Sequence, residues 1–440
     1  MNEWWKESVI YHIYPMGFCG APKENDFRSP AEHRIKKIKE LAPKLKDLGC
    51  GSLLLGPVFE STSHGYDIVD YYHIDRRLGN NRSFTETVNT MKNMGFRIIL
   101  DAVFHHTGRD FWAFYDLREK KEASPYRNWF SGVNFGSRSP YGDPFSYDAW
   151  EGHFSLVKLN LSSAEVKHHL FKAVEKWIIE WGIDGLRLDT AYCLDTAFIE
   201  ELNEFCKRIR PGFWLMGEAI HGDYRNWAGY RKLDSVTNYE CYKGLYSSHN
   251  DKNYFEIAYS LNRQFGDGGI YKDLNLYNFI DNHDVSRAAS IMNEKENLIP
   301  LYTLLFTIPG TPSIYYGSEE GQTGIKTPGS DWNLRPAADE INGGDRRLFS
   351  HIQAMIRLRQ KYKALRLGKY RQLSLSHQLF SFERKYEEER IVTAVNSDQR
   401  EAYLTIPGNE YLEMTDAFSG DHVRAPYHIP PHGCRVFRCL

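Results

Sequence analysis

The stretch Gly-Ile-Asp-Gly-Leu-Arg-Leu-Asp, residues 182–189, decides how this chain folds. It is a short apolar run that carries Arg187 and Asp189 two positions apart. Side chains alternate across a β-strand, so these two point to one face while Leu186 and Leu188 point to the other. A buried arginine beside an aspartate keeps the carboxylate ionised by placing an opposite charge next to it. Taken alone, the octapeptide is equally consistent with a structural ion pair at a strand end.

The bulk composition limits the classes of function. The chain has 440 residues, 42% hydrophobic and 25% charged, which is enough for one large globular domain and one or two small ones. Its formal net charge is −2, and acids and bases are mixed along its length, so we expect neither a nucleic-acid partner nor a membrane. A neutral substrate is expected. The 10 Trp and 28 Tyr suit flat sugar rings, although they suit a large core equally well.

The N-terminal residues and the cysteines indicate the compartment. Residues 1–6 lack the charged-then-apolar pattern of a secretory leader, and no run is long enough to span a bilayer. A cytoplasmic protein is expected, unless a leader was removed. The seven cysteines are scattered and form no Cys-x-x-Cys pair, so neither a disulfide framework nor a zinc site is indicated.

Strand and helix patterns alternate on both sides of residues 182–189. This alternation is typical of a parallel sheet with helical crossovers, and eight such units predict a closed (β/α)8 TIM barrel, an α/β fold. The expected strands are 8–15, 52–57, 96–104, 185–191, 213–219, 235–239, 276–281 and 313–316. The expected helices are 35–48, 84–94, 165–181, 195–209, 254–265, 298–308 and 346–362.

Two segments depart from the alternation. Residues 106–163 are rich in Gly, Pro, Ser, Tyr and Trp, and so long a connection predicts an inserted subdomain after the third strand. The barrel would then comprise residues 1–105 and 164–363. From 364 to 440 short alternating runs separated by turn residues predict a C-terminal antiparallel β domain, a sandwich that covers one side of the barrel.

Polar residues follow four of the expected strands, at the end of a TIM barrel where reactive groups lie. One acid of this kind is more often a helix cap or a solvated loop residue, but four strand ends supply them together. Paired carboxylates without an evident metal site or nucleophilic Ser or Cys set are what hydrolysis of a glycosidic bond requires. The residues are Asp101 and His106, then Asp189, then Glu218, then His283 and Asp284.

These strand ends resemble the four ordered motifs of the α-amylase family, glycoside hydrolase family 13. The similarity extends from about residue 11 to 317, and it implies a barrel with a C-terminal β domain. Supporting matches are Ser-His-Gly-Tyr-Asp (63–67) and Gly-Thr-Pro-Ser-Ile-Tyr-Tyr-Gly (310–317). The four motifs are Asp-Ala-Val-Phe-His-His (101–106), Gly-Leu-Arg-Leu-Asp (185–189), Gly-Glu-Ala (217–219) and Phe-Ile-Asp-Asn-His-Asp (279–284).

The resemblance implies a role for each acid. Asp189 would be the nucleophile, Glu218 the general acid and base, and Asp284 the acid that stabilises the oxocarbenium-like transition state. The residues themselves agree, because Glu218 follows the apolar run 213–216, where burial should raise its pKa toward the working pH. A retaining mechanism predicts that the Asp189 and Glu218 carboxyls lie roughly 5 to 5.5 Å apart.

The resemblance also implies the residues that hold the sugar. His106 and His283 would bind its hydroxyls, and Tyr66 would stack beneath its ring. Asp101 would hold Arg187, and Arg335 of the segment Trp-Asn-Leu-Arg-Pro (332–336) would reach the same sugar. The remaining histidines, among 17 in the chain, are expected to be structural.

Three departures from the family pattern bear on specificity and cofactors. Many α-amylases carry a calcium-binding Asn where this chain has His105, and a hard cation prefers oxygen ligands, so no metal cofactor is expected. Residues 190–193, Thr-Ala-Tyr-Cys, match neither the Lys-His pair of many amylases nor the Ala-Asn-Glu ending of neopullulanases. Val-Lys-Leu-Asn (157–160) is nonetheless similar to a segment of the neopullulanase and cyclomaltodextrinase group. The N-terminal domain of that group has no counterpart here, so its dimer is not expected and the oligomeric state stays open.

The leading hypothesis is a retaining α-glucan hydrolase that cleaves α-1,4 bonds of maltooligosaccharides, starch fragments or cyclodextrins through a covalent glycosyl-Asp189 intermediate. A transglycosylase is the main alternative, because a sugar hydroxyl can capture the same intermediate in place of water. A non-catalytic sugar-binding protein on the same barrel is a third, since fold does not imply function. Loss of one acid would be expected in such a protein, and all three acids are present.

Overall fold

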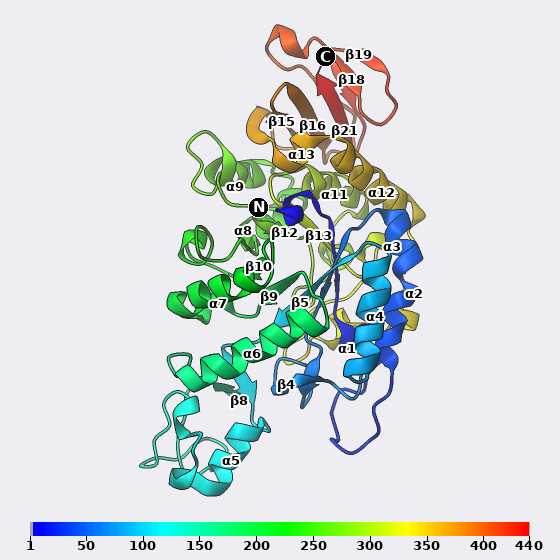
Figure 1. Ribbon diagram of the computed structural model, residues 1–440. Helices are drawn as coiled ribbons and strands as arrows, with labels where there is room; N and C mark the ends of the chain where they lie inside the picture. The colour runs from blue at the N-terminus through cyan, green and yellow to red at the C-terminus, as the bar shows by residue number, and fades with distance from the viewer. Residues whose placement is uncertain (1–2, 440) are drawn as a thin grey trace.

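The computed structural model describes residues 3–439, and an eight-stranded parallel sheet forms their centre (Figure 1). The strands follow the order β11-β10-β9-β5-β2-β1-β13-β12, and a parallel bridge between Thr237 and Tyr277 joins the two edges. The predicted (β/α)8 barrel is confirmed. Its strands are β1 (Ile10–Ile13), β2 (Ser52–Leu55), β5 (Arg97–Ala102), β9 (Gly185–Leu188), β10 (Trp214–Gly217), β11 (Ser235–Val236), β12 (Tyr277–Asn278) and β13 (Thr311–Tyr315).

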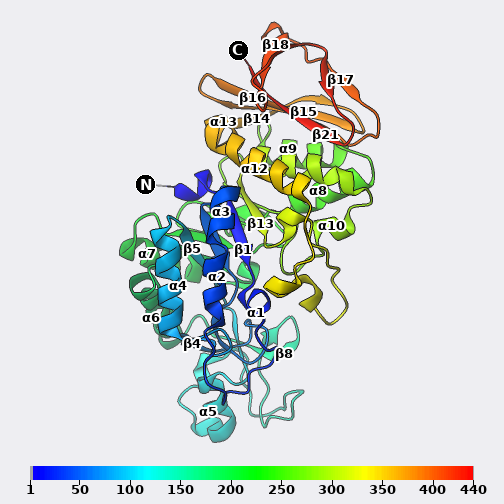
Figure 2. The same ribbon diagram turned by 90° about the vertical axis from the view of Figure 1, so that its right-hand side faces the viewer.

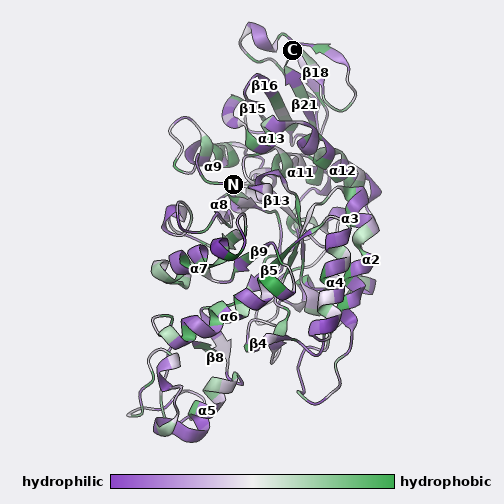
Figure 3. Ribbon diagram, viewed as in Figure 1, coloured by the Kyte–Doolittle hydropathy of each residue, from purple (hydrophilic) through white to green (hydrophobic). Residues whose placement is uncertain are grey.

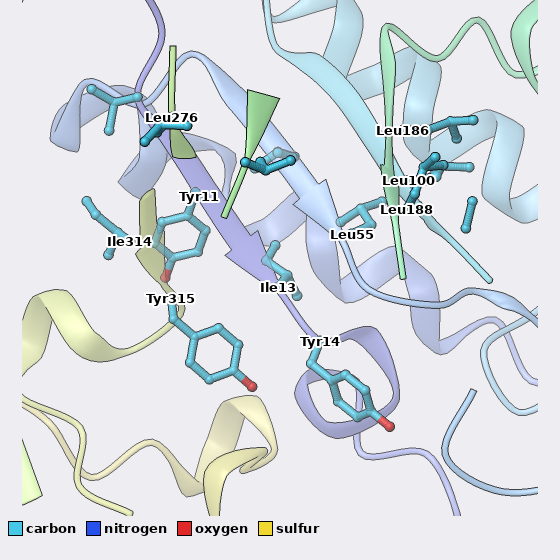
Figure 4. Close-up of a cluster of buried hydrophobic side chains, with 14 of the residues drawn as sticks. Tyr11, Ile13, Tyr14, Leu55, Leu100, Leu186, Leu188, Leu276, Ile314 and Tyr315 are labelled. Carbon is cyan, nitrogen blue, oxygen red and sulfur yellow. The ribbon is translucent and has the colours of Figure 1, made fainter. Parts of the chain in front are cut away.

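The alternation predicted for residues 182–189 is present in β9. Leu186 and Leu188 belong to the shell of apolar side chains between the barrel and its helices, beside Leu100 of β5 (Figure 4). Arg187 stands between these two leucines in the chain and is also buried. Its side chain lies on the opposite, inner face of the strand, where it contacts polar groups. Because side chains alternate along a strand, this four-residue strand presents packing residues on its outer face and a polar residue on its inner face.

The inner face of the barrel is apolar near the N-terminal ends of its strands. Trp4 and Trp5, from a 3-10 helix (Trp4–Glu7), pack against Trp214 with ring centroids 5.9 and 6.4 Å away. The Trp4 indole donates to the Gly212 carbonyl at 3.0 Å. The residues of this apolar layer are Trp4, Trp5, Ile10, Leu54, Ile99, Trp214, Met216, Tyr277 and Phe279.

Helices surround the barrel, and most of them carry both polar and apolar residues, as the hydropathy colouring shows (Figure 3). The described residues contain no α-helix between β10 and β11, only a 3-10 turn (Tyr224–Asn226), and the sequence pattern predicted no helix there. The expected helix 35–48 is interrupted, with Pro43 near the start of its second half. The helices are α2 (Lys37–Glu40), α3 (Ala42–Leu48), α4 (Asn81–Asn93), α6 (Ala164–Glu180), α7 (Thr196–Ile209), α8 (Tyr239–Asn250), α9 (Phe255–Phe265), α10 (Ala288–Ile291), α11 (Leu298–Thr307) and α12 (Arg346–Lys361).

Two smaller units adjoin the barrel. The insertion after the third barrel strand contains β6 (His106–Gly108), α5 (Trp112–Lys120), β7 (Ala149–Trp150) and β8 (His153–Lys158), with the sheet order β6-β8-β7. A hairpin of β3 (Phe59–Ser61) and β4 (Ile68–Ile74) lies beside it. Both views place α5 and the C-terminal sheet at opposite ends of the molecule (Figures 1 and 2).

The C-terminal unit is antiparallel, as predicted. After α13 (Lys363–Leu367) a six-stranded sheet forms, and a separate two-stranded sheet accompanies it. No helix among residues 3–439 has the length and apolar character needed to cross a membrane. In sheet order the six strands are β14 (Lys369–Leu375), β15 (Leu379–Tyr386), β16 (Glu389–Asn396), β21 (Gly433–Cys439), β18 (Glu413–Asp416) and β19 (His422–Arg424), and the pair is β17 (Ala402–Leu404) with β20 (Tyr427–Ile429).

Candidate active site

Strand register brings the predicted acids together at the C-terminal end of the barrel. Asp101 of β5 lies opposite Arg187 of β9. Asp189 directly follows β9, and Glu218 directly follows β10, where its backbone N–H donates to the Leu188 carbonyl at 2.9 Å. Acids that are far apart in the sequence therefore meet because their strands are neighbours in the sheet.

Arg187 is the centre of this arrangement. Its Nη1 lies 2.8 Å from Oδ1 of Asp101 and 2.8 Å from Oδ1 of Asp189, and its Nη2 lies 2.9 Å from Oε2 of Glu218. All four side chains are buried. One planar guanidinium, whose donors form a rigid fork, thus orients three carboxylates. The expected contact between Asp101 and Arg187 is present, and the contact to Glu218 is one that the sequence did not indicate.

Local backbone features place Asp189 and Glu218 side by side. Thr190 has a left-handed backbone (φ 44°), which is unusual for a β-branched residue, and its N–H donates to Oε2 of Glu218 at 3.1 Å. Gly217 allows the turn after β9 to approach β10, because a Cβ on Gly217 would lie 2.6 Å from the Cβ of Ala191. The spacing Gly217-Glu218 is therefore required by packing as well as by chemistry.

Burial dominates the protonation of the three acids around Arg187. It raises the pKa of Asp189 to about 7 and that of Asp101 to about 6, although the charge of Arg187 opposes both shifts. Burial also raises the pKa of Glu218, as predicted from the apolar run before it, again against Arg187. Arg187 favours the ionised form of Asp189, and burial opposes it more strongly. Three buried carboxylates share one cation, so the cluster keeps protons near neutral pH and titrates as a unit.

Asp284 belongs to a second group of charged residues, in which its pKa is lowered instead of raised. Its Oδ2 lies 2.8 Å from Nε2 of His283, and its Oδ1 lies 3.2 Å from Nη2 of Arg335. Burial acts to raise the pKa of Asp284, but His283 and then Arg335 and Arg187 together hold it well below its usual range. Asp284 therefore stays ionised under conditions in which the Arg187 cluster retains protons.

Tyr66 connects the two groups. It lies in the turn of the hairpin β3–β4, and its hydroxyl donates to Oδ2 of Asp101 at 3.0 Å and also contacts Nε2 of His283. Its ring is stacked on the His283 ring, with centroids 5.6 Å apart and an interplanar angle of 11°. The structure thus places Tyr66 beside Asp101 and His283, and Arg335 beside Asp284.

Two buried histidine atoms have open hydrogen-bonding capacity. Among the described residues no partner is found for Nε2 of His106 or Nδ1 of His283, although both side chains are buried. Burial lowers the pKa of His106 to about 3, so its ring is neutral at physiological pH. Buried polar atoms without partners are costly, and hydroxyl groups of a bound sugar would satisfy them.

The structure adds residues that the sequence reading did not select. His12 of β1 contacts the His283 ring edge-on at 5.1 Å, and Trp150 lies 5.9 Å from His106. The Tyr239 hydroxyl donates to Oε1 of Glu218 at 3.4 Å. The alternation around Ile13 could have identified His12, as it did Arg187, but Tyr239 begins a helix that the sequence pattern did not predict.

The donors present do not fit a calcium site at the position of His105. Its Nδ1 lies 3.3 Å from Nδ1 of His106, so this corner presents nitrogen atoms instead of the oxygen atoms that calcium prefers. Within residues 3–439 no group of three or more His, Cys, Asp or Glu side chains is arranged to hold a metal ion.

Comparison with known proteins is consistent with this geometry. Residues 13–342 match the family described as "Alpha amylase, catalytic domain". A neopullulanase 2 of Thermoactinomyces vulgaris is 31% identical over 454 aligned positions, which cover 96% of this chain and 75% of the relative. A cyclomaltodextrinase of a Bacillus species is 29% identical, covering 90% of this chain and 74% of the relative.

A solved structure extends the similarity to the whole fold. The ligand-free cyclic α-maltosyl-(1→6)-maltose hydrolase of Arthrobacter globiformis superimposes with a TM-score of 0.85 at 26% identity, and the match covers 100% of each chain. The barrel, the insertion and the C-terminal sheet are therefore shared with a protein of the same extent.

Proposed function

The chain belongs to the α-amylase family and is a glycoside hydrolase, and on this premise we propose that it is a retaining hydrolase of α-1,4-glucosidic bonds. The observation that carries the proposal is the pairing of Asp189 and Glu218 on the two terminal nitrogens of Arg187, because this pairing holds two carboxyls at one point of the barrel mouth. Retention requires two such carboxyls at close range.

The proposed reaction assigns one role to each acid. Glu218 protonates the leaving glycosidic oxygen while Asp189 forms a bond to the anomeric carbon, which gives a glycosyl-Asp189 intermediate. Glu218, now ionised, then removes a proton from water, and the resulting hydroxide displaces Asp189. The raised pKa of Glu218 supports the first step, since a proton must be present on the pair near neutral pH.

Asp284 supplies the negative charge for the transition state. Its pKa is held low by His283 and Arg335, so it faces the developing oxocarbenium ion as a carboxylate. His106 and His283 would bind hydroxyls of the same sugar, as their unpartnered atoms support, and Tyr66 would stack beneath its ring. Arg335 would act through Asp284 and the backbone carbonyl of His283, which its Nε contacts at 3.1 Å.

We propose maltooligosaccharides, starch fragments and cyclodextrins as substrates. The relatives named cyclomaltodextrinase and neopullulanase support this class, as does the Val-Lys-Leu-Asn segment at 157–160. A cytoplasmic location is part of this proposal, and relatives from Bacillus subtilis named intracellular maltogenic amylase support it.

The test is to incubate the protein with maltooligosaccharides, cyclodextrins, pullulan, starch and sucrose, and to resolve product size by chromatography and the anomer first released by NMR. We expect shorter α-configured products. Release of the β-anomer would exclude the double displacement through Asp189, and absence of any cleavage would exclude the hydrolase. Longer products at high oligosaccharide concentration would indicate transfer to a sugar instead of to water.

A further inference from the structure

A surface groove of about 850 Å³ begins beside the catalytic acid and runs over the outside of the barrel. Its inner end is formed by Tyr239, which donates to Glu218, and by Ile220 and His221, which follow Glu218 in the chain. Its outer wall is formed by one face of α9. The groove thus reaches a residue that contacts the general acid.

The wall on α9 has an aromatic pair at helical spacing. Phe255 and Tyr259 are four residues apart, so they project from the same face of the helix, and they are 46% and 69% exposed. The opposite face of α9 is buried through Ile257 and Leu261, which fixes the direction of the exposed pair. Exposed aromatic faces next to polar groups are suited to the alternating apolar faces and hydroxyl edges of a sugar chain.

Charges in the groove compensate one another. Arg263 pairs with Glu240 across the gap between α9 and α8, and Lys243 lies 3.5 Å from Glu256. Two cations and two acids therefore leave no excess of either sign on this wall. A strongly charged ligand would break these pairs, whereas a neutral chain can hydrogen-bond to them without disrupting the balance.

We propose that this groove binds the leaving-group side of an α-glucan chain, with Phe255 and Tyr259 as a distal platform for its sugar rings. The direction follows from chemistry: the general acid contacts the leaving oxygen, so sugars beyond that oxygen extend toward the residues after Glu218. The inference rests on the proposed function and adds a chain-length preference to it. Because the platform is remote from the reacting bond, it binds the ground state and the transition state alike and lowers KM for long chains.

The test compares a long linear maltodextrin with maltotriose in the wild type and in Tyr259→Ala. The ratio of kcat/KM for maltodextrin to that for maltotriose is expected to fall roughly three- to tenfold, mainly through KM, which is the usual worth of an aromatic stacking contact. Tyr259→Phe keeps the ring and should keep the ratio. Tyr115→Ala removes another exposed tyrosine from α5, at the other end of the molecule, and should also keep the ratio.

Three results would overturn the inference: an unchanged ratio in Tyr259→Ala, an equal loss on both substrates, or the same change in Tyr115→Ala. Native electrophoresis in a gel that contains amylose provides a second readout independent of turnover, in which Tyr259→Ala should be retarded less than the wild type. If the wild type cleaves no glucan but the gel shows this difference, the proposed function and the leaving-group assignment both fail, and only glucan binding at Tyr259 stands. If glucans are cleaved and the gel shows no difference, the groove assignment fails and the proposed function stands.

Discussion

The two ends of the barrel interior are built by the same strands and serve opposite purposes. On β5, Ile99 belongs to the apolar layer and Asp101 to the polar cluster, and β10 likewise begins with Trp214 and ends just before Glu218. Side chains two or four positions apart share a face of a strand. An apolar residue and an acid can therefore follow each other on the inner face of one strand without changing the fold. The difference teaches that stability and catalysis are separated along the strand axis.

The apolar layer stabilises the fold by burial, whereas the polar layer is held against its own repulsion. Three carboxylates around Arg187 include more negative charge than one guanidinium can balance. Burial raises the pKa values of Asp101, Asp189 and Glu218, and repulsion from the neighbouring carboxylates adds to the shift. Substitutions in the two layers should therefore affect different measurements.

The largest effect is expected in the polar layer. Glu218→Gln removes the proton donor but keeps the shape of the side chain, so kcat on an unactivated oligosaccharide should fall by about 10² to 10⁴. Thermal unfolding of the variant should stay close to that of the wild type, because no buried apolar contact is lost. Near-normal turnover in this variant would remove Glu218 from the role of general acid.

In the apolar layer we expect a large loss of stability instead of a loss of activity. Trp214→Ala deletes a fully buried ring that packs against Trp4 and Trp5, so the free energy of unfolding should drop by about 3 to 5 kcal/mol. Chemical denaturation measures this loss, and Trp214→Phe, which leaves a smaller cavity, should lose less. If Trp214→Ala also lowered kcat per folded molecule by a large factor, the separation of the two layers would be wrong.

A smaller effect links the polar cluster to pH. The pKa of Asp189 is about 7 in the fold against 3.8 as a free side chain, so its neutral form is favoured on folding. The stability that this group contributes is full at low pH and is lost as pH rises from about 4 to about 7. Asp189→Asn cannot ionise, so at about pH 8 it should unfold with a free energy roughly 1 to 3 kcal/mol above the wild type.

Near pH 4 the stabilities of Asp189→Asn and the wild type should converge, since the wild-type carboxyl is then protonated as well. Urea unfolding of both proteins at the two pH values measures the difference. A variant that is less stable than the wild type at high pH would show that Arg187 outweighs burial at this site.

The smallest effect is expected from chelation. The His105 corner presents nitrogen atoms instead of the oxygen atoms that calcium prefers, so we expect no functional calcium ion there. Exhaustive treatment with EDTA should leave both the melting temperature and the rate of glucan cleavage unchanged. Loss of either, with recovery on adding calcium, would contradict this reading of the site.

Much of the fold could be predicted because its signals are local. Apolar runs with Gly or Pro at their ends marked the barrel strands, and polar residues just beyond them marked the site. The helix α8 was not predicted, because it contains Gly244 and several small polar residues that weaken a helical pattern. Tertiary packing stabilises that helix through Leu245 and its contacts with α9.

By itself the sequence determined which residues share the inner face of each strand, because alternation depends only on neighbours in the chain. It thereby paired Arg187 with Asp189 and set Leu186 and Leu188 against the helices. Only the tertiary structure decided that Arg187 also reaches Glu218 and that burial outweighs it at Asp189. Distances between strands and the exclusion of water are properties of the assembled barrel, and the protonation of the acids depends on both.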